Sequence, residues 1–429
     1  MSQPFDSRSS RATRGSLAQG GRFGTALLWI LACASMVLLT YEAATLIGSV
    51  LRPLIANPQI IQTDFHYYYQ AAERFSASRK DLYAMADDVI AGFAYPPPAI
   101  VPFIWLAKAP LGTALLAFTI TSYLVLIGSL QQWIGYLRRS GFAVDRRSVV
   151  AIMLIALGLG PTYMNAVFGQ VNAFVLGAAV AFVCLAPTAT LEAASVLALG
   201  IWLKIYPIVL AAIAIWDRRA RRALAWSVVA LLAIGALAMA IVPYHEFEVF
   251  FREVLPARAD KTAIHIVNQS LVAFLERFRY PTDLFVNWTG HEAVRVSLVL
   301  RVVNAAFAAA AIAVMWQRRR FVALNAASLI ALIAVIAPLG WGHTYVMVLP
   351  LLVYQLIAMT TASLNTAIAI FLCVLAFMIP AGRQLPIEWA PDWLENVVYS
   401  RYLIATIALM LISTTIGQTT ESAPVTSFT

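Results

Sequence analysis

The sequence predicts an all-α polytopic membrane protein with about 10–13 transmembrane helices and two larger outer-face loops. Of the 429 residues, 61% are hydrophobic and only 12% are charged, and the mean hydropathy is +0.78. A soluble domain carries about 25% charged residues, so no water-soluble fold could hide this much apolar surface. Long apolar runs separated by short arginine-rich loops complete the pattern of a multi-pass protein.

Four arginine clusters set the predicted topology. Because cytoplasmic loops carry an excess of Lys and Arg, the clusters place their segments in the cytoplasm and the chain in the cell inner (cytoplasmic) membrane. This explains the net charge of +9 and predicts no nucleic-acid partner. The clusters are Arg8, Arg11, Arg14 and Arg22; Arg138, Arg139, Arg146 and Arg147; Arg218, Arg219, Arg221 and Arg222; and Arg318, Arg319 and Arg320.

The acidic residues agree with this topology, although they play no part in setting it. Of the 21 acidic residues, 15 fall in the segments that are left outside. The predicted outer segments are residues 51–95, about 161–170, 204–207, 244–293, 338–343 and 381–396.

The apolar runs predict the spans. The first run is longer than the core of a signal peptide, which spans about 7–15 residues, so we expect it to remain in the membrane. The run at 190–216 is too long for one span and is interrupted at WLKIYP, which predicts two half-length helices meeting at Lys204–Pro207. The short, proline-broken run at 96–107 predicts either a re-entrant segment or a true span. The predicted spans are 25–50, 112–137, 148–160, 171–187, 190–216, 223–243, 294–316, 321–337, 344–359, 364–380 and 397–416.

The chain is predicted to form a single integral-membrane domain over residues 22–417, with its larger outer loops at 51–95 and 244–293. The polar tails at 1–21 and 418–429 are expected to be disordered and cytoplasmic. The three cysteines lie far apart in apolar runs and predict neither a disulfide framework nor a metal site.

The first outer loop begins with TDFHYYYQAAERF, whose apolar and aromatic residues follow a helical spacing. We expect a short helix on the membrane surface, with Thr63 or Asp64 at its N-terminus. An aspartate there has two explanations. It can be an ordinary N-cap that the free N–H groups stabilise as an anion, or it can be a catalytic base. The sequence favours neither by itself, and the tyrosines also suit the headgroup region of a membrane.

Other polar groups reach the same predicted side of the membrane. Each has an ordinary structural explanation: amides can close a helix hairpin, a lysine at a break can reach lipid headgroups, and a lone histidine can donate a structural hydrogen bond. Their occurrence on one side, by a topology set independently, predicts one shared cavity. They are Gln170 and Asn172; Lys204 and Tyr206; Asn268 and Gln269; Trp341 and His343; and Arg301.

Five short blocks occur in order along the chain: D-F-x-x-Y-Y-x-A followed by L-Y and Y-P-P, then G-Q-x-N, K-x-Y-P, N-Q-S-L and W-x-H. The set resembles glycosyltransferase family 87, the polyprenol-phosphate-mannose-dependent α-mannosyltransferases of the C-type integral-membrane glycosyltransferase fold. The resemblance extends over roughly residues 25–416, and the order of the blocks is more specific than any one block. The segment ERFSASRKDLY departs from the family pattern because it lacks a glycine before LY.

The resemblance implies a catalytic aspartate in the first outer loop, which matches Asp64. It also implies a polyprenyl-phosphate sugar donor and a glycan or glycolipid acceptor, beside the membrane lipids. A single displacement needs one base and groups that hold the departing phosphate, so we assign Asp64 as general base and His343 as the second catalytic residue, facing the phosphate. The predicted donor phosphate-binding residues are Lys204, Arg301 and Tyr206. The predicted sugar- or acceptor-binding residues are His66, Tyr95, Gln170, Asn172, Asn268, Gln269 and Trp341.

We expect no cofactor and no metal ion, since the outer acidic residues form no recognisable cage of oxygen ligands. Two alternatives remain at this stage: a transporter or flippase of a lipid-linked sugar, and the same enzyme class acting on arabinofuranose or glucose. The absence of related halves favours an enzyme over a carrier. A structural membrane subunit would explain the arginine loops but not the outer polar set.

Overall fold

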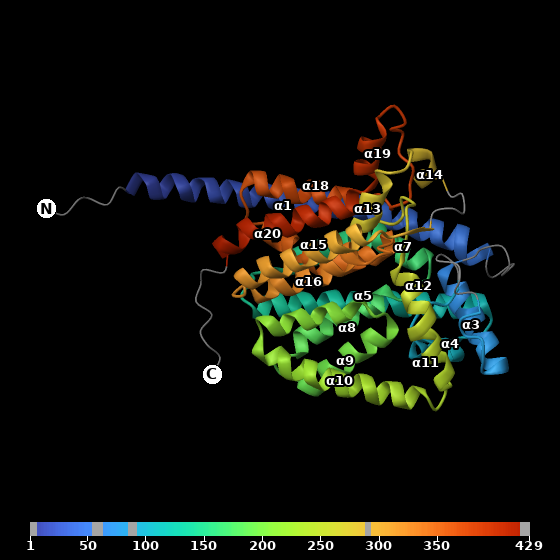
Figure 1. Cartoon of the computed structure of the whole chain (residues 1–429). Coiled ribbons are helices and arrows are strands. Elements are labelled where there is room, and N and C mark those ends of the chain that lie inside the picture. Colours follow the sequence, from blue (N-terminus) through green and yellow to red (C-terminus); the bar gives the residue numbers. More distant parts are fainter. Residues whose placement is uncertain (1–6, 54–62, 85–91, 288–292, 421–429) are drawn as a thin grey trace.

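The computed structural model describes residues 7–53, 63–84, 92–287 and 293–420. Its long helices run side by side along one axis, and α1 begins at the same end of the bundle at which α20 finishes (Figure 1). Among the described residues, five helical segments are long and apolar enough to cross a membrane, or up to seven if each of two bent pairs is one span. The protein is therefore an all-α polytopic membrane protein, as predicted.

The five long segments lie in α1 (Ser7–Thr45) with its π-helical continuation η1 (Leu46–Leu51), α5 (Leu111–Arg139), α10 (Arg218–Ala238), α15 (Leu298–Gln317), and η5 (Gly342–Val348) with α17 (Leu349–Met359). The bent pairs are α6 (Arg146–Leu157) with α7 (Gly160–Val167), at 52°, and α19 (Asp392–Tyr399) with α20 (Arg401–Thr420), at 65°. Shorter apolar helices are η2 (Pro97–Ala99) with α4 (Ile100–Leu106), α8 (Asn172–Leu185), α9 (Thr190–Leu203), η3 (Tyr206–Ile215), α16 (Val322–Ile336) and α18 (Leu364–Met378).

Local sequence explains where several helices begin. Asp145 caps α6 by accepting a hydrogen bond from the backbone N–H of Ser148 at 2.9 Å. Serines do the same for α13 (Leu271–Arg277), α15 and α18, at Ser270, Ser297 and Ser363. A side-chain oxygen at this position satisfies a helical N–H that has no partner within the helix.

The predicted break in the 190–216 run is confirmed. The helix α9 ends at Leu203, Lys204 has an extended backbone, and η3 begins at Tyr206 with Pro207 in its first turn. Proline cannot donate the hydrogen bond that would continue α9. The break leaves the lysine side chain at a helix end, inside the fold.

Two helices form the centre of the bundle. Both α16 and α17 are buried along almost their whole length, whereas α15 is mostly exposed. The arginine-rich junctions α5–α6, η3–α10 and α15–α16 lie at the end of the bundle where α1 begins, and α3 (Asp64–Ser78), α4, α11 (Tyr244–Val249) and α12 (Leu255–Ala259) lie at the opposite end (Figure 1). We call this opposite end the polar end of the bundle.

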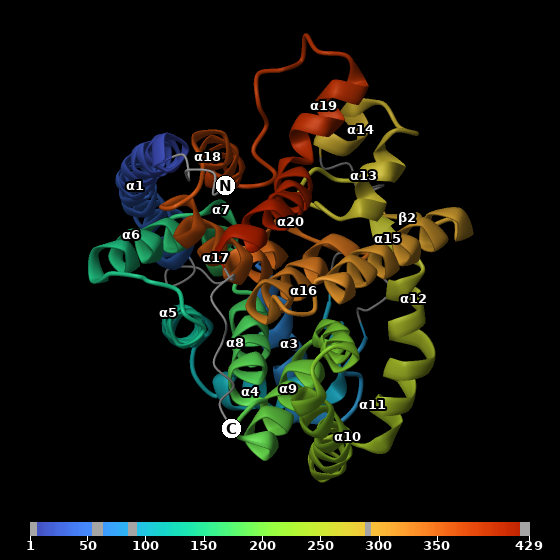
Figure 2. The same ribbon diagram turned by 90° about the vertical axis from the view of Figure 1, so that its left-hand side faces the viewer.

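A small lobe projects sideways from the polar end, where α14 and α19 stand apart from the bundle in both views (Figures 1 and 2). Its core is a separate cluster of Ile264, Ile266, Phe285 and Tyr399. Thr262 pairs with Val294 in the middle of its antiparallel strand pair. The remaining elements of this end are η4 (Phe250–Val254), β1 (Lys261–Ala263), α13 (Leu271–Arg277), α14 (Thr282–Val286) and β2 (Ala293–Arg295).

Some predicted segments fall outside the described residues. The tails at 1–21 and 418–429 do so in part, and α1 and α20 extend into them. The outer loops 51–95 and 244–293 likewise contain residues 54–62, 85–91 and 288–292, which are not described. The proline-broken run at 96–107 forms the short helical segment of η2 and α4.

Candidate active site

The helix α3 begins at Asp64, directly after Thr63 in an extended conformation. The Asp64 side chain points to a neighbouring turn, where its Oδ2 accepts a hydrogen bond from Nε2 of Gln170. Its side chain keeps 27% of its surface exposed. The carboxylate is thus held by the protein on one side and open to a substrate on the other.

A tight turn between α7 and α8 brings Gln170 to Asp64. The backbone N–H of Phe65 donates to the carbonyl oxygen of Phe168 at 3.1 Å, which joins the start of α3 to this turn. Gly169 has φ +61°, and a Cβ on it would lie 2.5 Å from Cβ of Phe65. Only glycine combines this backbone conformation with so close an approach.

A chain of hydrogen bonds fixes the orientation of the Gln170 amide. The hydroxyl of Tyr95 donates to Oε1 of Gln170 at 3.1 Å, and the hydroxyls of Tyr68 and Tyr95 are 2.7 Å apart. Because Tyr95 donates its single hydroxyl proton to Gln170, Tyr68 must be the donor in the hydrogen bond between the two tyrosine hydroxyls. The amide nitrogen of Gln170 therefore faces Asp64, and each donor in the series points toward the carboxylate.

A second set of buried polar groups approaches Asp64 from the other side. Nζ of Lys204 donates to Oδ1 of Asn172 at 2.9 Å, and Nδ2 of Asn172 lies 2.9 Å from Nδ1 of His343. The lysine fixes the amide, so Asn172 donates to Nδ1 and the proton of a neutral His343 resides on Nε2. That Nε2 is 3.8 Å from Oδ2 of Asp64. The donor and the acceptor are too far apart for a direct bond, but one substrate oxygen can reach both.

Burial raises the pKa of the Asp64 carboxyl from 3.8 to about 6. The hydrogen bond from Gln170 and the charges of Lys204 and Arg258 act in the opposite direction and favour the anion. The result is a carboxyl that titrates close to neutral pH, as a general base requires. A strongly perturbed pKa of this kind is typical of functional sites.

Arg258 on α12 was not predicted as a site residue. Burial raises the pKa of both Asp64 and Tyr95, and the charge of Arg258 opposes this rise at both groups, so the guanidinium lies within electrostatic range of the site. One sequence signal could have identified it. Arginine is expected mainly in cytoplasmic loops. An arginine between apolar residues of an outer loop therefore predicts an anionic partner for its charge. Tyr68 was noted only for its helical spacing, and the structure adds its hydroxyl to the hydrogen-bonded chain.

Two further predicted residues lie outside the hydrogen-bonded chain. The ring of Tyr206 is 5.2 Å from Nζ of Lys204, within the range of a cation–π contact. His66 is buried two residues after Asp64 on α3. Two residues turn an α-helix by about 200°, so His66 lies nearly opposite Asp64 on that helix.

Asn268 and Gln269 are fully buried, and their amides bond to the backbone. Nδ2 of Asn268 donates to the carbonyl oxygens of Ala263 and Pro338. Nε2 of Gln269 donates to the carbonyl oxygens of Ile266 and Tyr399, and its Oε1 accepts from Tyr402 N–H. These contacts hold the loop rather than point to a substrate.

The loop that Asn268 and Gln269 hold is joined to the His343 turn. Asn268 and Trp341 form an isolated antiparallel bridge, and the N–H of Gln269 donates to the carbonyl oxygen of Gly340 at 2.8 Å. The two amides therefore position the segment that carries Trp341 and His343.

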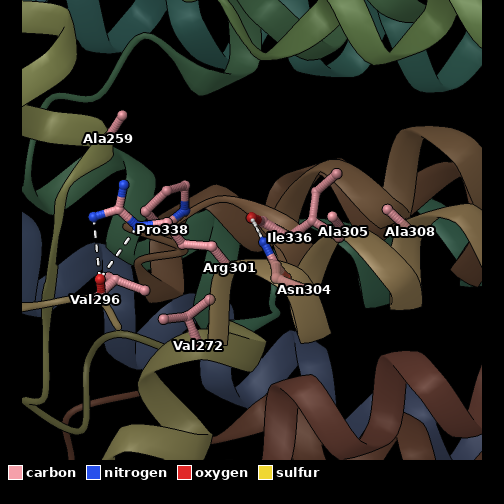
Figure 3. A pocket seen from close by; sticks show the side chains of 9 residues that line it. All are labelled: Ala259, Val272, Val296, Arg301, Asn304, Ala305, Ala308, Ile336 and Pro338. Atoms are coloured by element: carbon pink, nitrogen blue, oxygen red, sulfur yellow. Dashed lines mark hydrogen bonds between the residues drawn. The ribbon is translucent and has the colours of Figure 1, made fainter. Parts of the chain in front are cut away.

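Arg301 lies in different surroundings. It forms an ion pair with Asp260 at 2.8 Å and donates to the carbonyl oxygen of Val296. It lines a cavity of about 170 Å³ on the exposed helix α15, together with Asn304 and mostly apolar residues (Figure 3). These contacts place Arg301 at the junction of α15 with the second outer loop.

Within the described residues, no group of three or more His, Cys, Asp or Glu side chains is arranged to hold a metal ion. Metal-independent chemistry stays a prediction. The chemical groups of the site are one carboxylate, one imidazole, one buried ammonium and the guanidinium of Arg258.

The comparison with protein families supplies the identity. The sequence model of glycosyltransferase family 87 matches residues 93–340, which is more than half of the chain and includes Tyr95, Gln170, Lys204 and Arg258. His343 lies three residues after the matched range, and Asp64 lies 29 residues before it. No curated protein matches the chain. The chain belongs to glycosyltransferase family 87, and the protein is a sugar-transferring enzyme of the membrane.

Proposed function

We propose that the protein transfers a hexosyl group, mannosyl by the family resemblance, from a polyprenyl-phosphate sugar to a glycan or glycolipid acceptor. The reaction is a single displacement at the outer face of the cytoplasmic membrane. The observation that carries this proposal is the placement of Asp64 between Gln170 and His343, 3.8 Å from the imidazole. In this proposal the carboxylate contacts the acceptor oxygen as a base, and the imidazole contacts an oxygen of the donor phosphate as a hydrogen-bond donor.

Asp64 is the general base of this mechanism. The acceptor oxygen forms its bond to the anomeric carbon as its proton moves to the carboxylate. The bond from that carbon to the donor phosphate breaks at the same time, and its electron pair leaves on the phosphate oxygen. One displacement inverts the anomeric configuration. A single carboxylate suffices because the phosphate leaves without protonation, unlike the leaving group in the glycosidases that use two.

Lys204, Arg258 and His343 stabilise the departing phosphate. Lys204 uses one of its three N–H donors on Asn172, so it has donors left for phosphate oxygens. Arg258 adds a second cation from the other outer loop, and His343 presents Nε2–H. Donors that are already in place as charge develops lower the barrier without further reorganisation.

The arrangement of the bundle supports an outward-facing site. The site residues lie on elements of the polar end, and the arginine-rich junctions lie at the opposite end (Figure 1). Cytoplasmic loops are the arginine-rich ones, so the polar end faces the periplasm or the exterior. A polyprenyl chain in the outer leaflet reaches the site from the same side.

The direct test uses purified protein in detergent. It is supplied with radiolabelled polyprenyl-phosphate mannose, glucose or arabinofuranose, together with a lipid and glycan extract as acceptor. Label should enter the acceptor fraction from one of the three donors, and Asp64→Asn should abolish it. Because detergent removes the two compartments that transport requires, a transporter or flippase would leave every acceptor unlabelled. That result would reject the enzymatic proposal.

A further inference from the structure

The lobe at the polar end contains a second cavity, separate from the Asp64 site. It has a volume of about 470 Å³ and is lined by residues 277–281 together with Asp392 and Trp393. This volume falls in the range of small-molecule binding sites, about 300–1,000 Å³. The cavity lies between the start of α19 and the segment that follows α13. Both belong to the part of the fold that projects from the bundle (Figure 2).

The rim of this cavity combines aromatic rings with charged groups that have spare hydrogen-bonding capacity. Trp393 is 58% exposed, and Tyr280 lines the cavity beside it. Asp392 accepts one hydrogen bond, from the hydroxyl of Thr282 at 3.0 Å. The Arg279 side chain is 65% exposed and contacts Glu276 at 3.2 Å. A carboxylate has about four acceptor sites and a guanidinium five N–H donors, so both can bind further groups.

The floor of the cavity is rigid. Arg277 is 1% exposed and donates to Asn396 at 2.8 Å and to Ser400 at 2.6 Å. Its Nη1 also donates to the carbonyl oxygen of Asn268 at 2.8 Å, in the loop that pairs with Trp341. Trp341 is two residues before His343. The cavity and the catalytic imidazole are thus attached to one hydrogen-bonded segment.

We propose that this cavity is a binding site for an oligosaccharide, occupied by the part of the acceptor glycan that lies beyond the sugar being modified. A pyranose ring presents an apolar C–H face and a rim of hydroxyls, which match an exposed indole and a carboxylate–guanidinium pair. The acceptor is then held at two places, its terminal sugar at Asp64 and its inner sugars in the lobe. This inference rests on the proposed glycosyl transfer.

The competing explanation is that Trp393 faces lipid, since tryptophan is enriched at membrane interfaces. The charged rim argues against it. Charged groups such as Arg279 and Asp392 are costly in hydrocarbon, and a contact with lipid needs no cavity. The lobe also supplies a matched control: Trp389 is 80% exposed, more than Trp393, yet it does not line the cavity.

Binding of mannotetraose and mannose to the full-length protein in detergent, measured by saturation-transfer NMR, tests the proposal without requiring catalysis. We expect mannotetraose to bind more tightly than mannose. Trp393→Ala should weaken tetraose binding about tenfold, or ~1.4 kcal/mol, and Trp393→Leu should weaken it similarly, since it keeps apolar bulk without an aromatic face. Trp389→Ala should bind as the wild type does.

The proposal is overturned if the wild type binds neither saccharide, or if Trp393→Ala and Trp393→Leu bind the tetraose normally. Equal losses from Trp389→Ala and Trp393→Ala would also reject it, because an effect shared with a residue outside the cavity is not specific to the cavity. The two proposals fail separately. Tetraose binding that depends on Trp393 in a protein that transfers no sugar would reject only the function, and transfer with no effect of Trp393 on binding would reject only this site.

Discussion

Nε2 of His343 and Oδ2 of Asp64 lie 3.8 Å apart, although 279 positions of chain separate the two residues. Each is oriented by a different amide: Gln170 donates to Asp64, and Asn172 donates to His343. The two amides belong to one G-Q-x-N block, spaced by a single residue. One short turn therefore orients both of the groups that we propose as catalytic, and this relationship is the basis of the predictions below.

Asp64→Asn should lower the rate of sugar transfer by at least the 10²–10⁴-fold that general base catalysis contributes. Donor binding should persist, because the substitution leaves the cationic groups in place. Initial rates with radiolabelled donor and a donor-binding assay measure the two effects. Glu73→Gln is the matched control, since it removes a carboxylate from the exposed face of the same helix α3. Near-normal turnover by Asp64→Asn would refute the assignment.

The rate should depend on pH through Asp64. The base must be ionised, and burial raises its pKa to about 6, so kcat/KM should be low in acid, rise through about pH 6 and then reach a plateau. Gln170→Leu removes a hydrogen bond that favours the anion. The rise should therefore move to higher pH in this variant, as measured by a kcat/KM profile. An unchanged profile would show that another group controls the rate.

Arg258→Gln should have two coupled effects. The loss of a cation near the phosphate should lower kcat/KM, by roughly 10–100-fold if one charge-assisted hydrogen bond of about 1.5–3 kcal/mol is lost. It should also raise the pKa seen in the pH profile, because the charge of Arg258 lowers the pKa of Asp64. Arg252→Gln is the control, because Arg252 is exposed and forms an ion pair with Glu248, one helical turn away. This variant should change neither kcat/KM nor the pH profile. A purely structural Arg258 would change stability without moving the profile.

Lys204→Met should weaken the use of the donor more than Lys204→Arg. The methionine removes the buried ammonium and leaves Oδ1 of Asn172 without its donor, whereas arginine keeps a charge but cannot place it at the same point. Steady-state kinetics with varied donor should show a higher KM and a lower kcat. The control is Lys108→Met, an exposed lysine that lies over the ring of Trp105. Equal effects at both positions would contradict a specific role.

Gly169→Ala should destabilise the fold by about 1–3 kcal/mol, because its φ of +61° is unfavourable for alanine and its Cβ would meet Phe65 at 2.5 Å. The strain also displaces Gln170, so activity should fall in protein that remains folded. Thermal unfolding and transfer rates measure the two effects. At Gly128 on α5, no atom lies within 4 Å of an added Cβ, so Gly128→Ala should leave the melting temperature the same or slightly higher.

The sequence was sufficient for the class of helical multi-pass membrane protein, for the break at Lys204 and for part of the polar group around Asp64. The break at Lys204 could be predicted because an apolar run longer than one membrane thickness contains a lysine and a proline together. The start of α3 at Asp64 followed from helical spacing. Charge asymmetry between loops then placed Gln170, Asn172, Lys204 and His343 on one side, where the structure joins them in one group.

Hydrogen-bond partners could not be predicted in the same way. Asn268 and Gln269 lie in the same kind of polar block as Gln170 and Asn172, but they bond to backbone carbonyls instead of the catalytic groups. Arg301 is paired with Asp260, a contact across the second outer loop that spacing does not reveal. Such partners depend on tertiary packing, and so does the approach of Arg258 to Asp64.

The direction of the hydrogen bonds from Tyr68 through Tyr95 and Gln170 has a consequence for turnover. Every donor in that series points at Asp64, so the series offers no acceptor through which the carboxyl could pass a proton inward. In the proposed mechanism, the hydrogen ion captured in each cycle therefore departs by the exposed side of Asp64, to the product phosphate or to water at the polar end of the bundle. Turnover by this mechanism needs no proton path through the interior of the bundle.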